Sequence, residues 1–267
     1  MEATHATVDA LTARAICKRF VTDSGQQITA LQNISCSIPE NSFICIVGPS
    51  GCGKSTLLRV MAGLESCSSG ELLFRGNLQN APRREIGMVF QEYSLFPWRS
   101  VLENICFGPE LRRIDTKTRL ARGREFLDMV GLARYEAAKP HELSGGMRQR
   151  VAIARALANE PEILLMDEPF GAVDAYTRIR LQKSLLDIWQ KNRKTVVFVT
   201  HSVDEAVFLA DTIIVMSAGP GQILNEIKVE LPRPRQRDDP EYATLVGSIL
   251  RELELAEEVN DCSQVLI

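Results

Sequence analysis

A loop with the residue types and spacing of a phosphate cradle occurs early in the chain. The segment GPSGCGKST at 48–56 follows the apolar run FICIV at 43–47 and precedes a helical pattern at 54–62. Its glycines let backbone N–H groups turn toward phosphate oxygens, Lys54 reaches the β- and γ-phosphates, and the Ser55 hydroxyl ligates Mg²⁺. The alternative is a plain glycine turn, although a chance match at this length has a probability of about 1%. The predicted nucleotide-binding residues are Gly48, Pro49, Ser50, Gly51, Cys52, Gly53, Lys54, Ser55 and Thr56.

Two adjacent acids end another apolar run, ILLMDE, at Asp167 and Glu168. Beside a phosphate-binding loop, an acid at the end of a neighbouring buried strand holds Mg²⁺ through water. The glutamate that follows is then placed to polarise the attacking water. We therefore predict Asp167 as a metal residue and Glu168 as the catalytic base. The alternative is a strand that stops at acids for solubility.

Two further polar residues follow apolar runs, Gln91 after GMVF and His201 after TVVFVT. Ligands bind at strand ends in an open parallel sheet, so we expect Gln91 to reach Mg²⁺ and the attacking water. A neutral imidazole at His201 would hydrogen-bond the γ-phosphate and hold that water in place. Taken singly, Gln91 is a polar strand terminus and His201 a loop residue, and both alternatives stay open.

The elements that must position these residues alternate between strands and helices, and the strands are apolar throughout. This pattern is typical of a parallel sheet covered on both faces. We predict an α/β fold: a P-loop NTPase (RecA-like) core with a mostly parallel sheet, an antiparallel β subdomain and a helical subdomain. Short strands are expected over 11–40, helices without a strand over 95–158, a strand pair after Gly221 and a last helix over 241–258. Asn41, before FICIV, is expected in a turn that tolerates a left-handed backbone.

Composition limits the class of protein further. The 267 residues are 45% apolar and 24% charged with a net charge of −3, which does not suggest a nucleic-acid binder. Seven cysteines without a C-x-x-C pair are typical of reduced, buried thiols. We find neither a signal peptide nor an apolar run long enough for a membrane span, so any membrane role is expected to come through a partner.

A second anion site is predicted at LSGGM, residues 143–147, because a Ser-Gly-Gly step opens a helix there. Alone it could be only a helix cap. It is followed by RQRVAIARAL and then by ILLMDEP, however, and here the sequence resembles the ATP-binding cassette (ABC) family, the motor subunits of ABC transporters. The resemblance runs from Leu11 to Ile227. Its motifs are, in the order of the family, GPSGCGKST, Gln91, LSGGM, ILLMDE and His201, joined by GAVD at 171–174.

The resemblance implies a head-to-tail homodimer that binds ATP and Mg²⁺. Ser144, Gly145 and Gly146 of one subunit would close on the γ-phosphate held by the other. Asp174 would lie at the same interface, and Phe20 would stack on adenine unless it is an ordinary core residue. The sequence departs from many family members in having Met147 in place of Gln and GAVD in place of Ser-Ala-Leu-Asp.

The segment SLFPWRSVLENICFG, 94–108, displays Phe96, Pro97 and Trp98 together. These residues either fill the apolar core of the helical subdomain or, as the resemblance implies, form the surface that receives a coupling helix from a membrane subunit. The segments LFPW, LSGGMRQR and LPRPR resemble the corresponding sequences of the importer subgroup for nitrate, sulfonates and taurine. The implied partners are integral membrane permease subunits and, indirectly, a periplasmic or lipid-anchored solute-binding protein. The protein would lie peripherally on the cytoplasmic face of the membrane.

The resemblance also gives a domain organisation. An ABC ATP-binding domain would cover 1–230, with its helical subdomain at about 95–158, and a linker with a helical tail would cover 231–267. Three alternatives remain: a soluble ABC ATPase in translation or DNA repair, an ABC transporter ATPase for another small solute, and a P-loop kinase of small molecules. The first usually needs two cassettes or a long coiled coil, and the last leaves LSGGM without a role.

Overall fold

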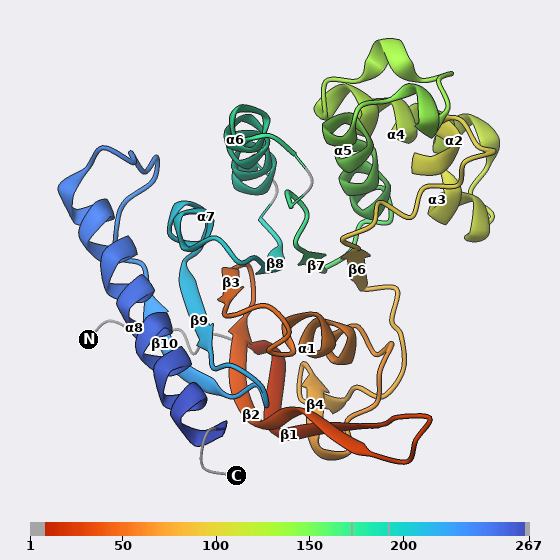
Figure 1. Cartoon of the computed structure of the whole chain (residues 1–267). Coiled ribbons are helices and arrows are strands. Elements are labelled where there is room, and N and C mark those ends of the chain that lie inside the picture. Colours follow the sequence, from red (N-terminus) through yellow and green to blue (C-terminus); the bar gives the residue numbers. More distant parts are fainter. Residues whose placement is uncertain (1–8, 172, 192, 265–267) are drawn as a thin grey trace, which may run out of the picture. The chain divides into compact units, whose positions relative to one another are not determined.

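The computed structural model describes residues 9–171, 173–191 and 193–264. The chain forms two compact units (Figure 1). The first contains Met1–Arg83 and Thr195–Ile267, and the second contains Arg84–Lys194. The second unit is therefore an insertion within the first.

An antiparallel sheet forms one part of the first unit. Its strand order is β2-β1-β4-β5, and in β2 the buried Ile34, Cys36 and Ile38 alternate with exposed residues. The expectation of short strands is wrong for the first two, which have 13 residues each, because buried apolar residues recur over 10–16 in β1 and over 31–38 in β2. The strands are β1 (Asp9–Val21), β2 (Gln27–Pro39), β4 (Ser69–Phe74) and β5 (Asn77–Leu78).

A mostly parallel sheet forms the other part of the first unit. Strand β3 (Phe43–Val47) is parallel to both β8 (Thr195–Val199) and β9 (Thr212–Met216). All residues of β3 and β8 are buried, as their unbroken apolar runs predict. Strand β10 (Ile223–Lys228) adds antiparallel to β9. The last strand pair is therefore β9 and β10. Only β10 follows Gly221, so the prediction that the whole pair follows Gly221 is wrong.

A left-handed turn precedes β3, and the described part of the first unit contains three helices. Asn41 has a φ of 58°, which confirms the left-handed turn before β3. The helices are α1 (Lys54–Met61), α7 (Val203–Leu209) and α8 (Pro240–Gln264). Helix α8 is longer than expected and packs against α7, with Ile249 fully buried, and Asn225 of β10 donates to Glu252 of α8.

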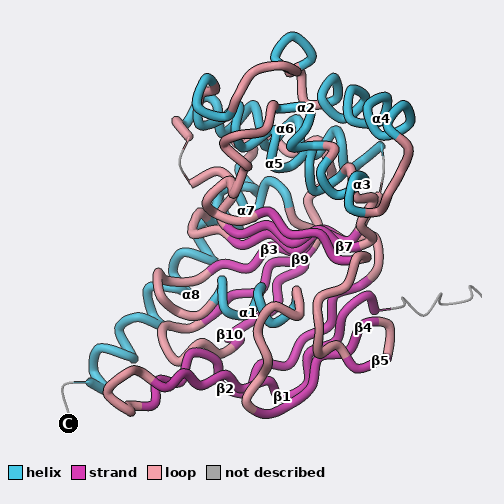
Figure 2. Tube along the Cα trace, turned by 90° about the vertical axis from the view of Figure 1, so that its right-hand side faces the viewer, coloured by secondary structure: helices cyan, strands magenta, loops and turns pink. Residues whose placement is uncertain are grey.

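The second unit combines two parallel strands with helices. Strands β6 (Ile86–Val89) and β7 (Ile163–Asp167) pair in parallel. Between 95 and 158 the described structure is helical and contains no strand, as predicted; Figure 2 shows these helices in cyan. The helices are α2 (Val101–Ile105), α3 (Phe107–Leu111), α4 (Thr116–Met129), α5 (Gly145–Leu157) and α6 (Ala175–Lys191), with 3₁₀ turns at Ala133–Tyr135 and Pro140–Glu142.

The helices α2, α4 and α5 share an apolar core. Ser100 and Glu103 form a reciprocal capping box at the start of α2, and Asp115 caps α4. The core residues are Val101, Ile105, Leu127, Val130, Leu132, Leu143, Val151, Ala154 and Ala158. With its parallel and antiparallel sheets and its group of helices, the chain has the predicted α/β fold class.

None of the helices in the described part of the chain is both long enough and apolar enough to span a membrane.

Candidate functional site

The glycine-rich loop lies between β3 and α1 and encloses its lysine. Lys54 is 4% exposed, and its Nζ donates to the backbone oxygens of Gly48 and Pro49, both at 2.7 Å. The carbonyl oxygens of the loop therefore hold the ammonium group inside the loop. That this group reaches the phosphates of a nucleotide stays a prediction from the sequence.

Two glycines of the loop are required by close packing. A Cβ at Gly48 would lie 2.8 Å from the backbone oxygen of Met216. Gly53 has a φ of 99°, and a Cβ there would lie 2.7 Å from the backbone oxygen of Ala30. The loop is thus pressed against β2 and against the end of β9, and larger residues would displace it.

Gly53→Ala should lower ATP affinity about tenfold or more, because the loop or β2 must move to admit the methyl group. The measurement is a titration with a fluorescent ATP analogue, together with a thermal melt. Gly25→Ala is the matched control, since Gly25 also has a positive φ of 83° but its Cβ would meet nothing within 4 Å. Gly25→Ala should cost about 1 kcal/mol of stability and leave affinity unchanged. Equal affinities in the two variants would contradict this interpretation of the loop.

Cys52 supports the loop from inside. Its side chain is 1% exposed and its Sγ lies 3.9 Å from Lys54 Nζ. Burial raises the pKa of the Cys52 thiol, and the nearby ammonium only partly offsets that effect. The thiol is therefore neutral, and it fills space rather than acting as a nucleophile.

His201 lies at the same edge of the first unit's sheet as the loop. Strands β3 and β8 are parallel with Ile46 paired to Val199, and Thr200 N donates to Ile46 O at 3.1 Å. Because the loop follows β3 and His201 follows β8, both stand at the carboxyl ends of neighbouring strands. His201 is exposed.

Phe20, the predicted adenine platform, is also in the first unit. It is 39% exposed on β1, so it is not an ordinary core phenylalanine. Lys18 Nζ lies 4.8 Å from the centre of the Phe20 ring. In the β1–β2 ladder Lys18 is the partner of Leu31, which directly follows Ala30, the residue close to Gly53. The hairpin β1–β2 thus runs from the glycine-rich loop to this aromatic face.

The second unit holds two of the predicted metal residues, Gln91 and Asp167, and the predicted base, whereas Ser55 lies in the first unit. Val89 of β6 pairs with Met166 of β7, so Gln91 after β6 and Asp167 at the end of β7 stand at the carboxyl ends of neighbouring parallel strands. Asp167 is 7% exposed, and Gln91 is exposed. Glu168 has a φ of 40°, in the left-handed region that non-glycine residues rarely adopt. The residue proposed as base therefore has a strained backbone.

Ser144 caps helix α5, with its Oγ accepting from Met147 N at 3.3 Å. The Ser144 hydroxyl uses only an acceptor lone pair in this cap, so its hydrogen is still able to donate a hydrogen bond. Asp174 caps α6 and accepts from Thr177 N at 3.0 Å, which lowers the pKa of its carboxyl. A Cβ at Gly146 would lie 3.0 Å from Thr177 Cγ2, so the Ser-Gly-Gly step and the turn of Asp174 are neighbours.

An aromatic cluster follows Gln91 in the second unit. The ring centres of Phe96 and Trp98 are 5.5 Å apart, and those of Phe96 and Phe107 are 4.5 Å apart. Trp98 is 71% exposed, so it does not plug the helical core, whereas Phe96 is half-buried. An exposed indole held by packed rings is typical of a contact surface.

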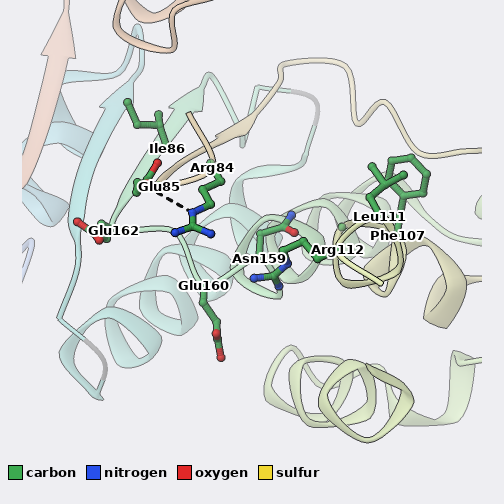
Figure 3. A pocket seen from close by; sticks show the side chains of 11 residues that line it. Arg84, Glu85, Ile86, Phe107, Leu111, Arg112, Asn159, Glu160 and Glu162 are labelled. Atoms are coloured by element: carbon green, nitrogen blue, oxygen red, sulfur yellow. Dashed lines mark hydrogen bonds and ion pairs between the residues drawn. The ribbon is translucent and has the colours of Figure 1, made fainter. Parts of the chain in front are cut away.

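A hollow of about 520 Å³ lies beside this cluster and was not predicted from the sequence. Phe107 lines it together with Arg84, Leu111 and Arg112, and Figure 3 shows Arg84 reaching Glu85 at 3.4 Å. Its lining comes from three separate segments, the start of β6, helix α3 and the residues between α5 and β7. Such a set has no common sequence signal, although the exposed Leu111 on a short helix is one weak sign.

Comparisons with known proteins show the family to which this chain is similar. The family described as ABC transporter matches residues 31–171. The aliphatic sulfonates import ATP-binding protein SsuB of Bacillus subtilis is 45% identical over 91% of this chain and 93% of its own length. The nitrate import ATP-binding protein NrtD of Synechocystis sp. is 46% identical over 86% of this chain and 91% of its own length.

A solved structure has the same fold. It is a dimeric post-hydrolysis state of an ATP-binding cassette bound to ADP and Pi, with a TM-score of 0.74 and 34% identity. The match covers 83% of this chain and all of the other. The likeness confirms that the α/β fold described above is that of a P-loop ATPase cassette.

Proposed function

This chain belongs to the ABC transporter family, and we propose that within it the chain drives import of a small anionic solute such as nitrate, a sulfonate or taurine. As a member it binds ATP and is an ATPase coupled to transport. The observation that carries the proposal is its identity of 45% and 46% with sulfonate and nitrate import subunits over most of each chain.

The nucleotide would be held mainly by the first unit. Lys54 would exchange its bonds to Gly48 and Pro49 for the β- and γ-phosphates, and the backbone of 48–56 would cradle them. Phe20 would stack on adenine. Mg²⁺ would neutralise developing charge on the phosphates. The oxygen donors that would hold it are the hydroxyl of Ser55, the amide of Gln91 and the carboxylate of Asp167, a set of hard ligands that suits this ion.

Hydrolysis would use groups from both units. Glu168 would accept a proton from the attacking water, and Gln91 and His201 would hold that water in line with the γ-phosphate. Catalysis of this kind is mostly positioning, because little covalent chemistry is left to the protein. The strained backbone at Glu168 is compatible with this role, and seven other described non-glycine residues also have a positive φ.

The finished site would need two subunits arranged head to tail. Ser144, Gly145 and Gly146 would close on the γ-phosphate of the partner, with the Ser144 hydroxyl and the first N–H groups of α5 as donors. Asp174, next to that step through Thr177, would lie in the same interface. The dimeric state of the similar solved cassette supports this arrangement.

Coupling to membrane permease subunits would take place on the aromatic cluster and the hollow beside it. Trp98 offers an exposed apolar anchor, and Leu111 and Phe107 give the hollow an apolar side, a combination suited to an inserted helix. The subunit would then lie peripherally at the cytoplasmic face, and a solute-binding protein would deliver the solute on the other side. The two import relatives support this assignment.

Replacing Phe96 and Trp98 together by Ala should abolish uptake while ATP affinity stays unchanged, because the cluster would contact the permease and not the nucleotide. Uptake of labelled nitrate and of a labelled aliphatic sulfonate is measured in cells that lack the native gene. The control is Leu78→Ala, which removes an exposed apolar side chain, 54% exposed, on β5. Wild-type uptake by the double variant would contradict the docking role, and uptake of neither anion by cells with the native chain would contradict the proposed solute class.

A further inference from the structure

The segment 231–239, which we call the arginine strap, joins the region after β10 to helix α8 in the first unit (Figure 1). It carries arginines at three alternate positions, and each is bound to α7 or to the loop directly after it. Arg233 is paired with the carboxylate of Asp211. Arg237 donates from Nε to both carboxylate oxygens of Asp204, at 3.0 and 2.9 Å. The strap therefore follows α7 along its length.

Arg235, the middle arginine, is bound to the carboxyl end of α7. Its side chain donates to the backbone oxygens of Val207 at 2.7 Å, Phe208 at 3.3 Å and Ala210 at 2.6 Å. The last carbonyls of a helix lack partners within it, and the fork of N–H groups on a guanidinium can serve several at once. Arg235 is 7% exposed, and burial lowers its pKa to about 10, so it is charged at neutral pH.

The amino end of α7 is bonded to both residues that flank His201. Thr200 Oγ1 donates to the buried Glu205 carboxylate at 2.5 Å and accepts from Ser202 N at 3.0 Å. Ser202 Oγ accepts from Glu205 N at 3.3 Å. The first turn of α7 thus fixes the backbone before and after His201, and any displacement of the helix would move the imidazole.

We propose that the arginine strap sets the position of the His201 imidazole by holding α7, with Arg235 as the positioning residue. The proposal rests on the proposed function, in which His201 contacts the γ-phosphate. A helix of seven residues has little stability of its own, so its place is determined by what binds it. Tyr242 of α8 adds a bond from its hydroxyl to Asp204 O at 2.7 Å, which extends the hold from the strap to the last helix.

The position of His201 can be observed directly because the chain has only three histidines. In protein labelled with ¹³C-histidine, the ring signals of His201 and His141 are assigned from the His201→Gln and His141→Gln variants. Arg235→Ala should shift the His201 signal and leave the His141 signal in place. Arg235→Lys, which keeps a charge and fewer donors, should give an intermediate shift. Arg251→Ala is the matched control, since the hydrogen bond that Arg251 makes in the described part of the chain stays within α8, to Gly247 O.

Steady-state kinetics give the second readout. Arg235→Ala should lower kcat for ATP hydrolysis about tenfold or more while KM changes less than about twofold, because a small displacement of a catalytic group reduces rate rather than binding. If Arg235→Ala does not fold, Arg237→Ala, whose ion pair to Asp204 is partly exposed, decides by the same two measurements.

An unchanged His201 signal would overturn the proposal, and so would equal shifts at His141 and His201 with loss of ATP binding. Failure of the proposed function looks different. In that case His201→Gln hydrolyses ATP at the wild-type rate, while the ring signals still report whether the strap holds α7.

Discussion

Glu168→Gln should lower the rate of ATP hydrolysis at least about 100-fold and leave ATP binding intact, because the amide is nearly isosteric but cannot accept the proton of the attacking water. With hydrolysis blocked, ATP should remain between the two subunits and hold them together. Phosphate release measures the first effect. Light scattering at millimolar ATP measures the second, in which monomers should be converted to dimers.

Three further variants separate the formation of the dimer from the loss of the base. Glu125→Gln changes an exposed glutamate on α4 and should leave both rate and association unchanged. Added to Glu168→Gln, Ser144→Asp should prevent the dimer, because Asp still caps α5 but repels the partner's γ-phosphate. Ser144→Asn, which caps without charge, should allow it. A Glu168→Gln protein that stays monomeric, or one that dimerises equally well with Ser144→Asp, would contradict the head-to-tail site.

Lys54→Ala should weaken ATP binding at least about tenfold, since a charge-assisted contact to two phosphates is lost. Lys54→Met tests the charge alone, because it keeps the buried stem and removes the ammonium. Both variants should bind ATP more weakly than wild type, by similar factors, in isothermal titration.

Lys54→Ala should also lower the free energy of unfolding of the nucleotide-free protein. Lys54 Nζ bonds two loop carbonyls, so Lys54→Ala leaves Gly48 O and Pro49 O without these donors. A thermal melt of the nucleotide-free variant should therefore show about 1–3 kcal/mol of destabilisation. Lys117→Ala, an exposed lysine on α4, is the control for both measurements. Unchanged ATP affinity in Lys54→Ala would refute the assignment of the loop.

Much of the site could be predicted because its residues follow strands. The apolar runs of β3 and β8 identify buried parallel strands, and the rule that ligands bind at their carboxyl ends then places the loop and His201 at one edge. The same reasoning places Gln91 with Asp167 in the second unit. These predictions need only local patterns and one topological rule.

The rest depends on contacts between segments far apart in the chain. Nothing near Gly53 in the sequence shows that β2 comes within van der Waals distance of it. Nothing near Arg235 shows that its guanidinium will bind two carbonyls of α7 and a third directly after the helix. The prolines and charges of 231–239 are equally typical of an unattached linker. Whether such a segment binds to the rest of the fold is decided by tertiary packing. The spacing of apolar residues in the sequence does not reveal that packing.

The backbone at Glu168 also bears on how this position came to hold its residue. At a φ of 40°, glycine would be the cheapest occupant, and any residue with a Cβ lowers the stability of the fold by about 1 kcal/mol. Proteins keep residues that are not the most stable choice for their position as long as the fold stays stable enough to function. The acid at 168 therefore costs the fold stability that glycine would save, and the carboxylate that we propose as the catalytic base is what the protein would gain in exchange.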